Sequence, residues 1–229
     1  MMNNRDKAIL NDLQRFRVMT RDQIAKLHFQ GLKNPSNSAN AVLKRLTRDK
    51  YIKANKLWSP YLYTLEENKI KKDSQKIPHF LEIVNCYMDI KSLREPKHLI
   101  VEPKYGKGNI EPDLFIMLGK QPLFIEIQRN LYTNKVMQDK IDRYEAYYHA
   151  GQWQHESWQP DDKMVFPSIL ILTPTRYPIQ SQLRIYQAPS ITEFLEKITK
   201  APVVSDRPHS RPVQQSKHKL QNGKLNFAQ

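Results

Sequence analysis

The sequence predicts an α+β chain in two parts: a small helical module with a short hairpin, then an α/β module with a mixed sheet. Apolar residues recur at helical spacing up to about residue 50, whereas later apolar runs have strand length and alternate with long helical segments. Charge changes along the chain as well. Residues 1–78 hold 17 Lys and Arg against 7 Asp and Glu, residues 79–199 hold 14 against 15, and residues 200–229 hold 6 against 1.

These changes in pattern and charge set the expected boundaries. We expect a first module at residues 1–68, a linker at 69–78, a second module at 79–199 and a basic tail at 200–229. The tail is rich in Pro, Gln, Ser, Lys and His, and it has too few apolar residues to order itself, so we expect it to be disordered.

The first module is expected to contain three helices followed by two strands. The helices start at Asn4, run over 20–29 behind an N-cap at Thr20, and run from a cap at Ser36 or Ser38 to about residue 50. The strands lie at 51–57 and 61–65, on either side of a turn that contains Pro60. This order is that of a winged helix-turn-helix, in which the third helix enters the major groove and the hairpin forms the wing.

Polar and basic residues on the outer face of the third helix suit double-stranded DNA as the partner. The candidate DNA contacts are Asn37, Asn40, Lys44, Arg45, Arg48, Lys53 and Lys56. The two asparagines could reach base edges, and the cations suit phosphates. The same pattern also fits a small helical domain with a basic solvent-exposed face, or a winged module that binds protein.

The second module is expected to run helix, three strands, helix, strand, and then a further strand and helix. The segments are residues 78–90 (helix), 99–102 (strand), 111–128 (hairpin), 132–150 (helix), 166–172 (strand), 183–186 (strand) and 191–198 (helix). Residues 166–172 are continuously apolar, which is typical of a strand buried on both faces.

The hairpin at 111–128 carries one acid on each strand. If Gly119 and Lys120 form a two-residue turn, with Gly119 supplying a positive φ, Leu118 pairs with Gln121. Counting back then pairs Asp113 with Glu126, and Gln128 shares the face of Glu126. Two carboxylates this close are unfavourable unless a cation or a proton joins them, and a hard divalent metal accepts such oxygen ligands.

This hairpin within this order of elements resembles the PD-(D/E)XK nuclease superfamily, through Pro112-Asp113 on one strand and Glu126-Ile127-Gln128 on the next. Together with the N-terminal module, residues 5–199 resemble the replication-relaxation family of plasmid and mobile-element proteins. The features that carry this resemblance are His79-Phe80-Leu81, the Glu-Pro-Asp strand, Glu126 to Arg129, and residues 140–144. The resemblance implies a DNA-acting role in plasmid replication, relaxation or mobilisation.

The resemblance also implies roles for individual residues. Asp113 and Glu126 would bind Mg²⁺ or Mn²⁺, with Glu82 a further ligand or water partner. Gln128 stands where the superfamily has a catalytic Lys, and Gln carries no positive charge. Lys140 or Lys135, on the following helix, could replace that charge. The alternative is a degenerate nuclease fold that is kept for DNA binding or protein contact.

Three functions therefore stay open: a metal-dependent nuclease or nickase, a non-catalytic scaffold that recruits a relaxase or replication initiator, and a transcriptional regulator. The apolar runs are too short for a membrane span, the N-terminus has no signal-peptide pattern, and Cys86 has no disulfide partner, so we expect a cytoplasmic protein. We expect His79 to be a surface or packing residue. Trp153 and Trp158 are expected in a loop that either packs on the sheet or stacks on an unpaired base.

Overall fold

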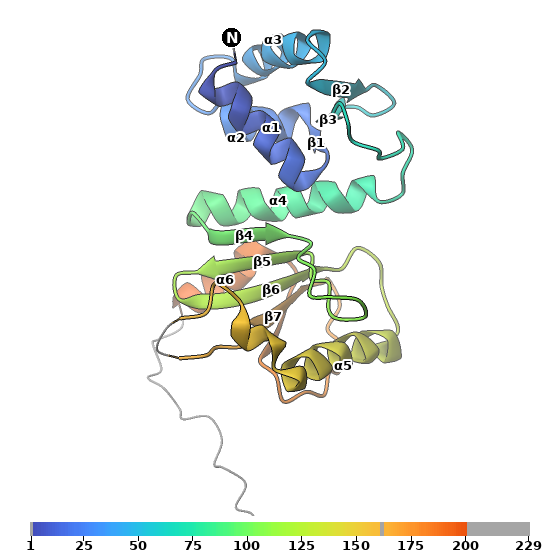
Figure 1. Ribbon diagram of the computed structural model, residues 1–229, viewed down its shortest axis with the longest axis vertical. Coiled ribbons are helices and arrows are strands. Elements are labelled where there is room, and N and C mark those ends of the chain that lie inside the picture. Colours follow the sequence, from blue (N-terminus) through green and yellow to red (C-terminus); the bar gives the residue numbers. More distant parts are fainter. Residues whose placement is uncertain (1, 161–162, 201–229) are drawn as a thin grey trace, which may run out of the picture.

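The computed structural model describes residues 2–160 and 163–200, so the expected disorder of the tail falls almost wholly outside the described residues. Within that part of the chain the fold is α+β, with six α-helices, a small antiparallel sheet and a mixed five-stranded sheet. Figure 1 shows three tiers: the first module at one end, helix α4 across the middle, and the larger sheet with α5 below it.

The first module contains three helices and three short strands. They are α1 (Asn4–Phe16), β1 (Met19–Thr20), α2 (Arg21–His28), α3 (Pro35–Arg48), β2 (Ile52–Asn55) and β3 (Leu62–Leu65). The strands form an antiparallel sheet in the order β1-β3-β2. The order of three helices and a terminal hairpin agrees with the sequence prediction, and β1 is an addition to it.

Side-chain caps define where the first two helices begin. Thr20 caps α2 as predicted, and a second capping box joins Asn3 to Asp6 at the start of α1. The predicted cap of α3 at Ser36 or Ser38 is wrong. Helix α3 begins at Pro35, behind Asn34, because the fixed φ of proline suits the first helical position.

Helix α4 (Ile77–Leu93) is buried on two sides and joins the two parts of the chain. On one side Tyr87 packs against Phe16 of α1, with ring centroids 5.1 Å apart, and Gln23 of α2 donates to the carbonyl of Leu81. Its other side shares a core with Ile125 of the larger sheet. One continuous apolar core therefore runs from α1 through α4 to the sheet.

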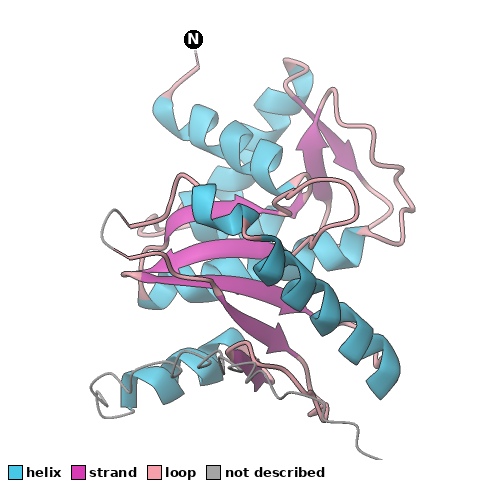
Figure 2. Cartoon of the chain, turned by 60° about the horizontal axis from the view of Figure 1, so that its bottom comes forward, coloured by secondary structure: helices cyan, strands magenta, loops and turns pink. Residues whose placement is uncertain are grey.

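The larger sheet has the strand order β4-β5-β6-β7-β8. Its strands are β4 (Lys97–Val101), β5 (Leu114–Leu118), β6 (Gln121–Ile127), β7 (Ser168–Leu172) and β8 (Ile185–Ala188). Strands β4 to β6 are antiparallel, and β6 to β8 are parallel. Helix α5 (Asn134–Ala150) makes the crossover between β6 and β7, and α6 (Ile191–Lys200) follows β8. Figure 2 shows the twisted sheet with helices against it.

The α5 face of this sheet carries an aromatic core. Trp153, in the short 3-10 helix η1 (Gln152–His155), and Trp158 are each 6% exposed. Trp158 packs on Phe115 and Trp153 stacks on Tyr148, with ring centroids 4.7 and 5.7 Å apart. Of the two sequence interpretations, packing against the sheet is the correct one, since a buried indole cannot stack on a base.

Helices of the described residues are too short or too polar to cross a membrane. Cys86 lies on the inner side of α4, where burial raises the pKa of its thiol well above the usual range. A thiol in that setting behaves as a small apolar side chain.

Candidate functional site

The hairpin register brings two acids to one end of the larger sheet. Gly119 has φ +68°, Leu118 pairs with Gln121, and Leu114 pairs with Ile125, as the sequence predicts. Asp113 comes immediately before β5, and the amide of Ile127 donates to its Oδ2 at 2.6 Å. Glu126 is next to the end of β6, so the two carboxylates occupy the same end of the sheet.

Glu126 is the buried member of this pair. Its side chain is 3% exposed, Lys140 Nζ lies 2.5 Å from Oε2, and the Tyr144 hydroxyl donates to Oε1 at 2.6 Å. Burial raises the pKa of Glu126, the neighbouring charge of Asp113 raises it further, and Lys140 opposes both effects. Of the two lysines predicted on this helix, Lys140 forms the ion pair with Glu126, whereas Lys135 is exposed.

Asp113 has a partner that sequence reasoning missed. His79, in the first turn of α4, lies with Nε2 2.9 Å from Asp113 Oδ1. This hydrogen bond raises the pKa of His79, and burial opposes the rise. The histidine is 28% exposed and the aspartate 14%, so the pair can reach solvent. The expectation that His79 is a surface or packing residue overlooked this pairing, because the two residues are 34 positions apart in sequence.

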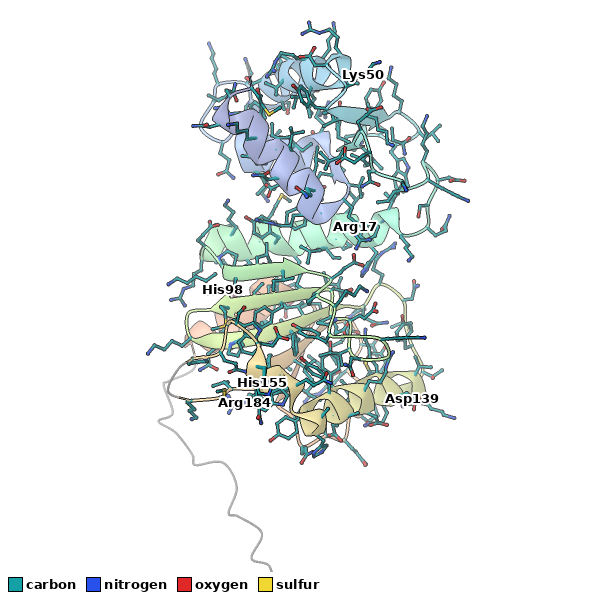
Figure 3. The ribbon with its side chains drawn as sticks, in the orientation of Figure 1. Arg17, Lys50, His98, Asp139, His155 and Arg184 are labelled. Atoms are coloured by element: carbon teal, nitrogen blue, oxygen red, sulfur yellow. The ribbon has the colours of Figure 1, made fainter. Side chains whose placement is uncertain are left out.

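Arg17 of the first module contacts two residues next to this site in the sequence or the sheet. It follows α1, it forms an ion pair with Glu102 beside β4, and its guanidinium lies 5.1 Å from the centre of the Phe80 ring. Figure 3 shows Arg17 where the first module meets α4. The charge of Glu102 also raises the pKa of His79. A charged residue of the first module therefore pairs with Glu102, and the charge of Glu102 in turn acts on the histidine that contacts Asp113.

Two other predicted site residues have no contact with the acids among those that the described residues show, and each has surroundings of its own. Glu82 is exposed on α4 and lines a groove with Asp22 and Lys26 of α2, on the side of α4 that faces the first module. Gln128 is buried, and its amide donates to the carbonyl of Asn130 at 3.1 Å. That contact fixes the loop after β6.

The carboxylate oxygens of Asp113 and Glu126 are the type of ligand that Mg²⁺ or Mn²⁺ prefers. All four of them already accept hydrogen bonds, from His79, Ile127, Lys140 and Tyr144. Each of these oxygens keeps a second lone pair that a divalent ion could accept. Across residues 2–160 and 163–200, no group of three His, Cys, Asp or Glu side chains is arranged to hold a metal.

The predicted DNA contacts on α3 fall into two sets. Asn37, Asn40, Lys44 and Arg48 are exposed, and their spacing of three and four residues puts them on one face. Arg45 is turned away from this face, and its guanidinium donates to the fully buried Asp6 at 2.7 Å.

The hairpin lysines divide in the same way. Lys53 donates to the carbonyls of Glu66 and Asn68, whereas Lys56 is exposed in the turn between β2 and β3. Arg45 and Lys53 thus hold the module together, and the exposed set remains for a partner.

Comparisons with protein-family models, with curated proteins and with solved structures found no match. The interpretation of these two surfaces therefore depends on their own geometry.

Proposed function

We propose that the chain binds double-stranded DNA through the exposed face of α3, with the first module acting as a winged helix-turn-helix. The observation that carries this proposal is the set Asn37, Asn40, Lys44 and Arg48, which is exposed on one face of the third helix of the module. Asparagine amides suit base edges in the major groove, and the cations suit flanking phosphates. The excess of basic residues in 1–78 favours the same partner.

The role that we propose for this DNA binding is in plasmid or mobile-element replication, relaxation or mobilisation, within the cytoplasm. Support comes from the second module, in which a helix precedes a mixed sheet and two acids meet at the end of a hairpin. This arrangement is consistent with a PD-(D/E)XK-like domain. In this proposal the second module is a non-catalytic platform that recruits a relaxase or replication initiator, because Gln128 stands where a nuclease of this type has a cationic lysine, and its uncharged amide donates to the carbonyl of Asn130.

The DNA proposal is tested with the full chain, by fluorescence anisotropy of a labelled duplex over a series of salt concentrations. Affinity should fall steeply with salt, because phosphate contacts release counterions. Lys44→Ala and Arg48→Ala should each weaken binding to every duplex and reduce the salt slope by about one. Asn40→Ala should change the preference between sequences instead.

The matched control is Lys135→Ala, which removes an exposed lysine from α5 in the other module. It should leave affinity and salt slope as in the wild type. A duplex affinity that is independent of salt, or that drops equally in the control, would remove α3 as the DNA-binding surface.

Metal-dependent nicking is a second candidate, and the contact between Lys140 and Glu126 favours it. Asp113 and Glu126 would hold the ion, which would supply Lewis-acid stabilisation of the phosphate. Lys140 would supply the positive charge that Gln128 lacks. The test is incubation of supercoiled plasmid with the protein and Mn²⁺, together with melting curves in the presence and absence of the ion.

The two candidates predict opposite results in that experiment. If the acids bind metal, Mn²⁺ should raise the melting temperature and support nicking, and Asp113→Asn should abolish both effects while DNA binding persists. If the module is a platform, the melting temperature should be unchanged and the plasmid should stay supercoiled.

A further inference from the structure

A pocket of about 650 Å³ opens at the end of the larger sheet opposite Asp113 and Glu126. It lies between the end of α4, the β5–β6 turn and α6, and its lining includes Leu118, Leu123 and Phe194. This volume is within the range of small-molecule sites, roughly 300–1,000 Å³. The pocket is separate from both surfaces described above, because it uses the opposite ends of β5 and β6.

Apolar side chains remain exposed around this pocket. Leu93 is 56% exposed, Ile198 45% and Tyr186 36%, and all three are part of the lining. Large apolar side chains that gather around a hollow indicate a binding surface, whereas the same residues scattered singly would not. An apolar body is the group that would gain most from entering this space.

Two arginine side chains in the lining carry positive charge, which favours a ligand with a negatively charged group. Arg94 follows the end of α4, and its guanidinium group lies beside Gly119 in the β5–β6 turn. Arg184 comes from the loop before β8, and Figure 3 shows it at the end of the molecule away from Arg17. Glu196 is also part of the lining, and it already interacts with another residue of the protein. Guanidinium groups pair well with planar carboxylates.

We propose that this pocket binds a small amphipathic carboxylic acid. Its aliphatic or aryl body fills the space between Leu123 and Phe194, and its carboxylate pairs with Arg94 and Arg184. A sugar or nucleobase suits the pocket less well, because such ligands need several hydrogen-bonding partners and the lining is mostly apolar. The proposal does not depend on DNA binding or on metal.

The test is calorimetric titration of the full chain with decanoate and, separately, with decan-1-ol, which has the same body without the charge. Decanoate should bind saturably and more tightly than the alcohol. Arg184→Gln and Arg94→Gln should each weaken decanoate binding about tenfold, the loss expected for one hydrogen bond to a charged group. Neither variant should change binding of the alcohol.

Two further variants distinguish binding in the pocket from non-specific electrostatic or hydrophobic binding elsewhere on the protein. Arg129→Gln removes an exposed guanidinium at the opposite end of the sheet and should leave decanoate binding intact. Leu93→Trp adds bulk at an exposed position of the lining and should weaken binding of both probes.

Three results would overturn the proposal. One is an absence of saturable decanoate binding. Another is equal affinity for the acid and the alcohol, with no effect of either arginine variant. The third is a loss of decanoate binding in Arg129→Gln as large as in the Arg94 and Arg184 variants, because the effect of charge would then not be local to the pocket.

Discussion

Asp6 is fully buried in α1 and serves two parts of the first module at once. One carboxylate oxygen accepts from the amide of Asn3 in the capping box, and the other accepts from Arg45 of α3. The pair therefore joins the start of the first helix to the third helix, and the predicted phosphate contact at Arg45 becomes a contact within the fold.

Replacing Asp6 by Ala should lower the free energy of unfolding by about 3 kcal/mol, because it leaves a partly buried guanidinium without its acid and removes half of the cap. Chemical denaturation measures this change. Arg48→Ala is the matched control, since Arg48 is 73% exposed and pairs with its sequence neighbour Asp49, and it should cost less than about 1 kcal/mol. Equal losses in the two variants would contradict the structural role of Asp6.

The pair of His79 and Asp113 predicts a pH dependence of stability. The hydrogen bond to Asp113 raises the pKa of His79 above its ordinary value of 6.5, so the folded chain holds the proton more tightly than the unfolded chain does. The stabilisation is therefore complete below pH 6.5 and is lost as the pH rises through the raised pKa.

His79→Gln should consequently reduce the free energy of unfolding more in mildly acidic buffer than in mildly alkaline buffer. Denaturation of the wild type and the variant in both buffers measures the difference. His155→Gln, which changes an exposed histidine of η1, should show no such change between buffers. A loss from His79→Gln that is the same in both buffers would argue against a charged pair.

At the scale of elements, the β5–β6 hairpin depends on one backbone angle. Gly119 adopts φ +68° in a two-residue turn, where an L side chain is strained. Gly119→Ala should destabilise the chain by about 1–2 kcal/mol, as measured by thermal or chemical denaturation. Gly119→Asn should recover part of the loss, because Asn tolerates the left-handed region better. A stabilising effect of alanine would show that the turn does not need this angle.

Features that are set by residues close together in the sequence could be predicted, whereas contacts between distant residues could not. The hairpin register follows from two turn residues and strand alternation, so Asp113 and Glu126 were found from the sequence, and helical spacing pointed to Lys140 with Tyr144. The pairs His79–Asp113 and Arg45–Asp6 join residues 34 and 39 positions apart, and only the packing of whole elements brings them together. The cap of α3 was wrong because Pro35 outweighs the serines that follow it.

At the scale of the molecule, the continuous core through α4 predicts that both modules unfold together. Ile9 of the first module and Ile125 of the larger sheet belong to the same apolar core, and α4 lies between them. Removing either neighbour would expose one apolar side of α4 to water. Residues 69–76, which precede α4, therefore join parts that share their stability.

Hydrogen exchange in a denaturant series, followed by mass spectrometry, should show peptides of α1 and of β6 becoming exposed at the same denaturant concentration. Loss of protection in α1 at clearly lower denaturant than in β6 would mean that the first module opens alone. A destabilising change in α1, such as Asp6→Ala, should shift both sets of peptides equally if the coupling is real.

Helix α4 packs against the first module on one side and against the larger sheet on the other, so it cannot change in length without losing contacts. Each residue added to a helix turns everything after it by about 100° and advances it by about 1.5 Å. A single insertion in the middle of α4 would rotate its second half against α1 and against the sheet together, so that no movement of one layer alone restores both contacts. The same insertion at residues 69–76, which are not in a helix or strand, rotates no part of α4, so the helix keeps its register against both layers. Length variation in this chain should therefore concentrate before α4 and be excluded from its middle.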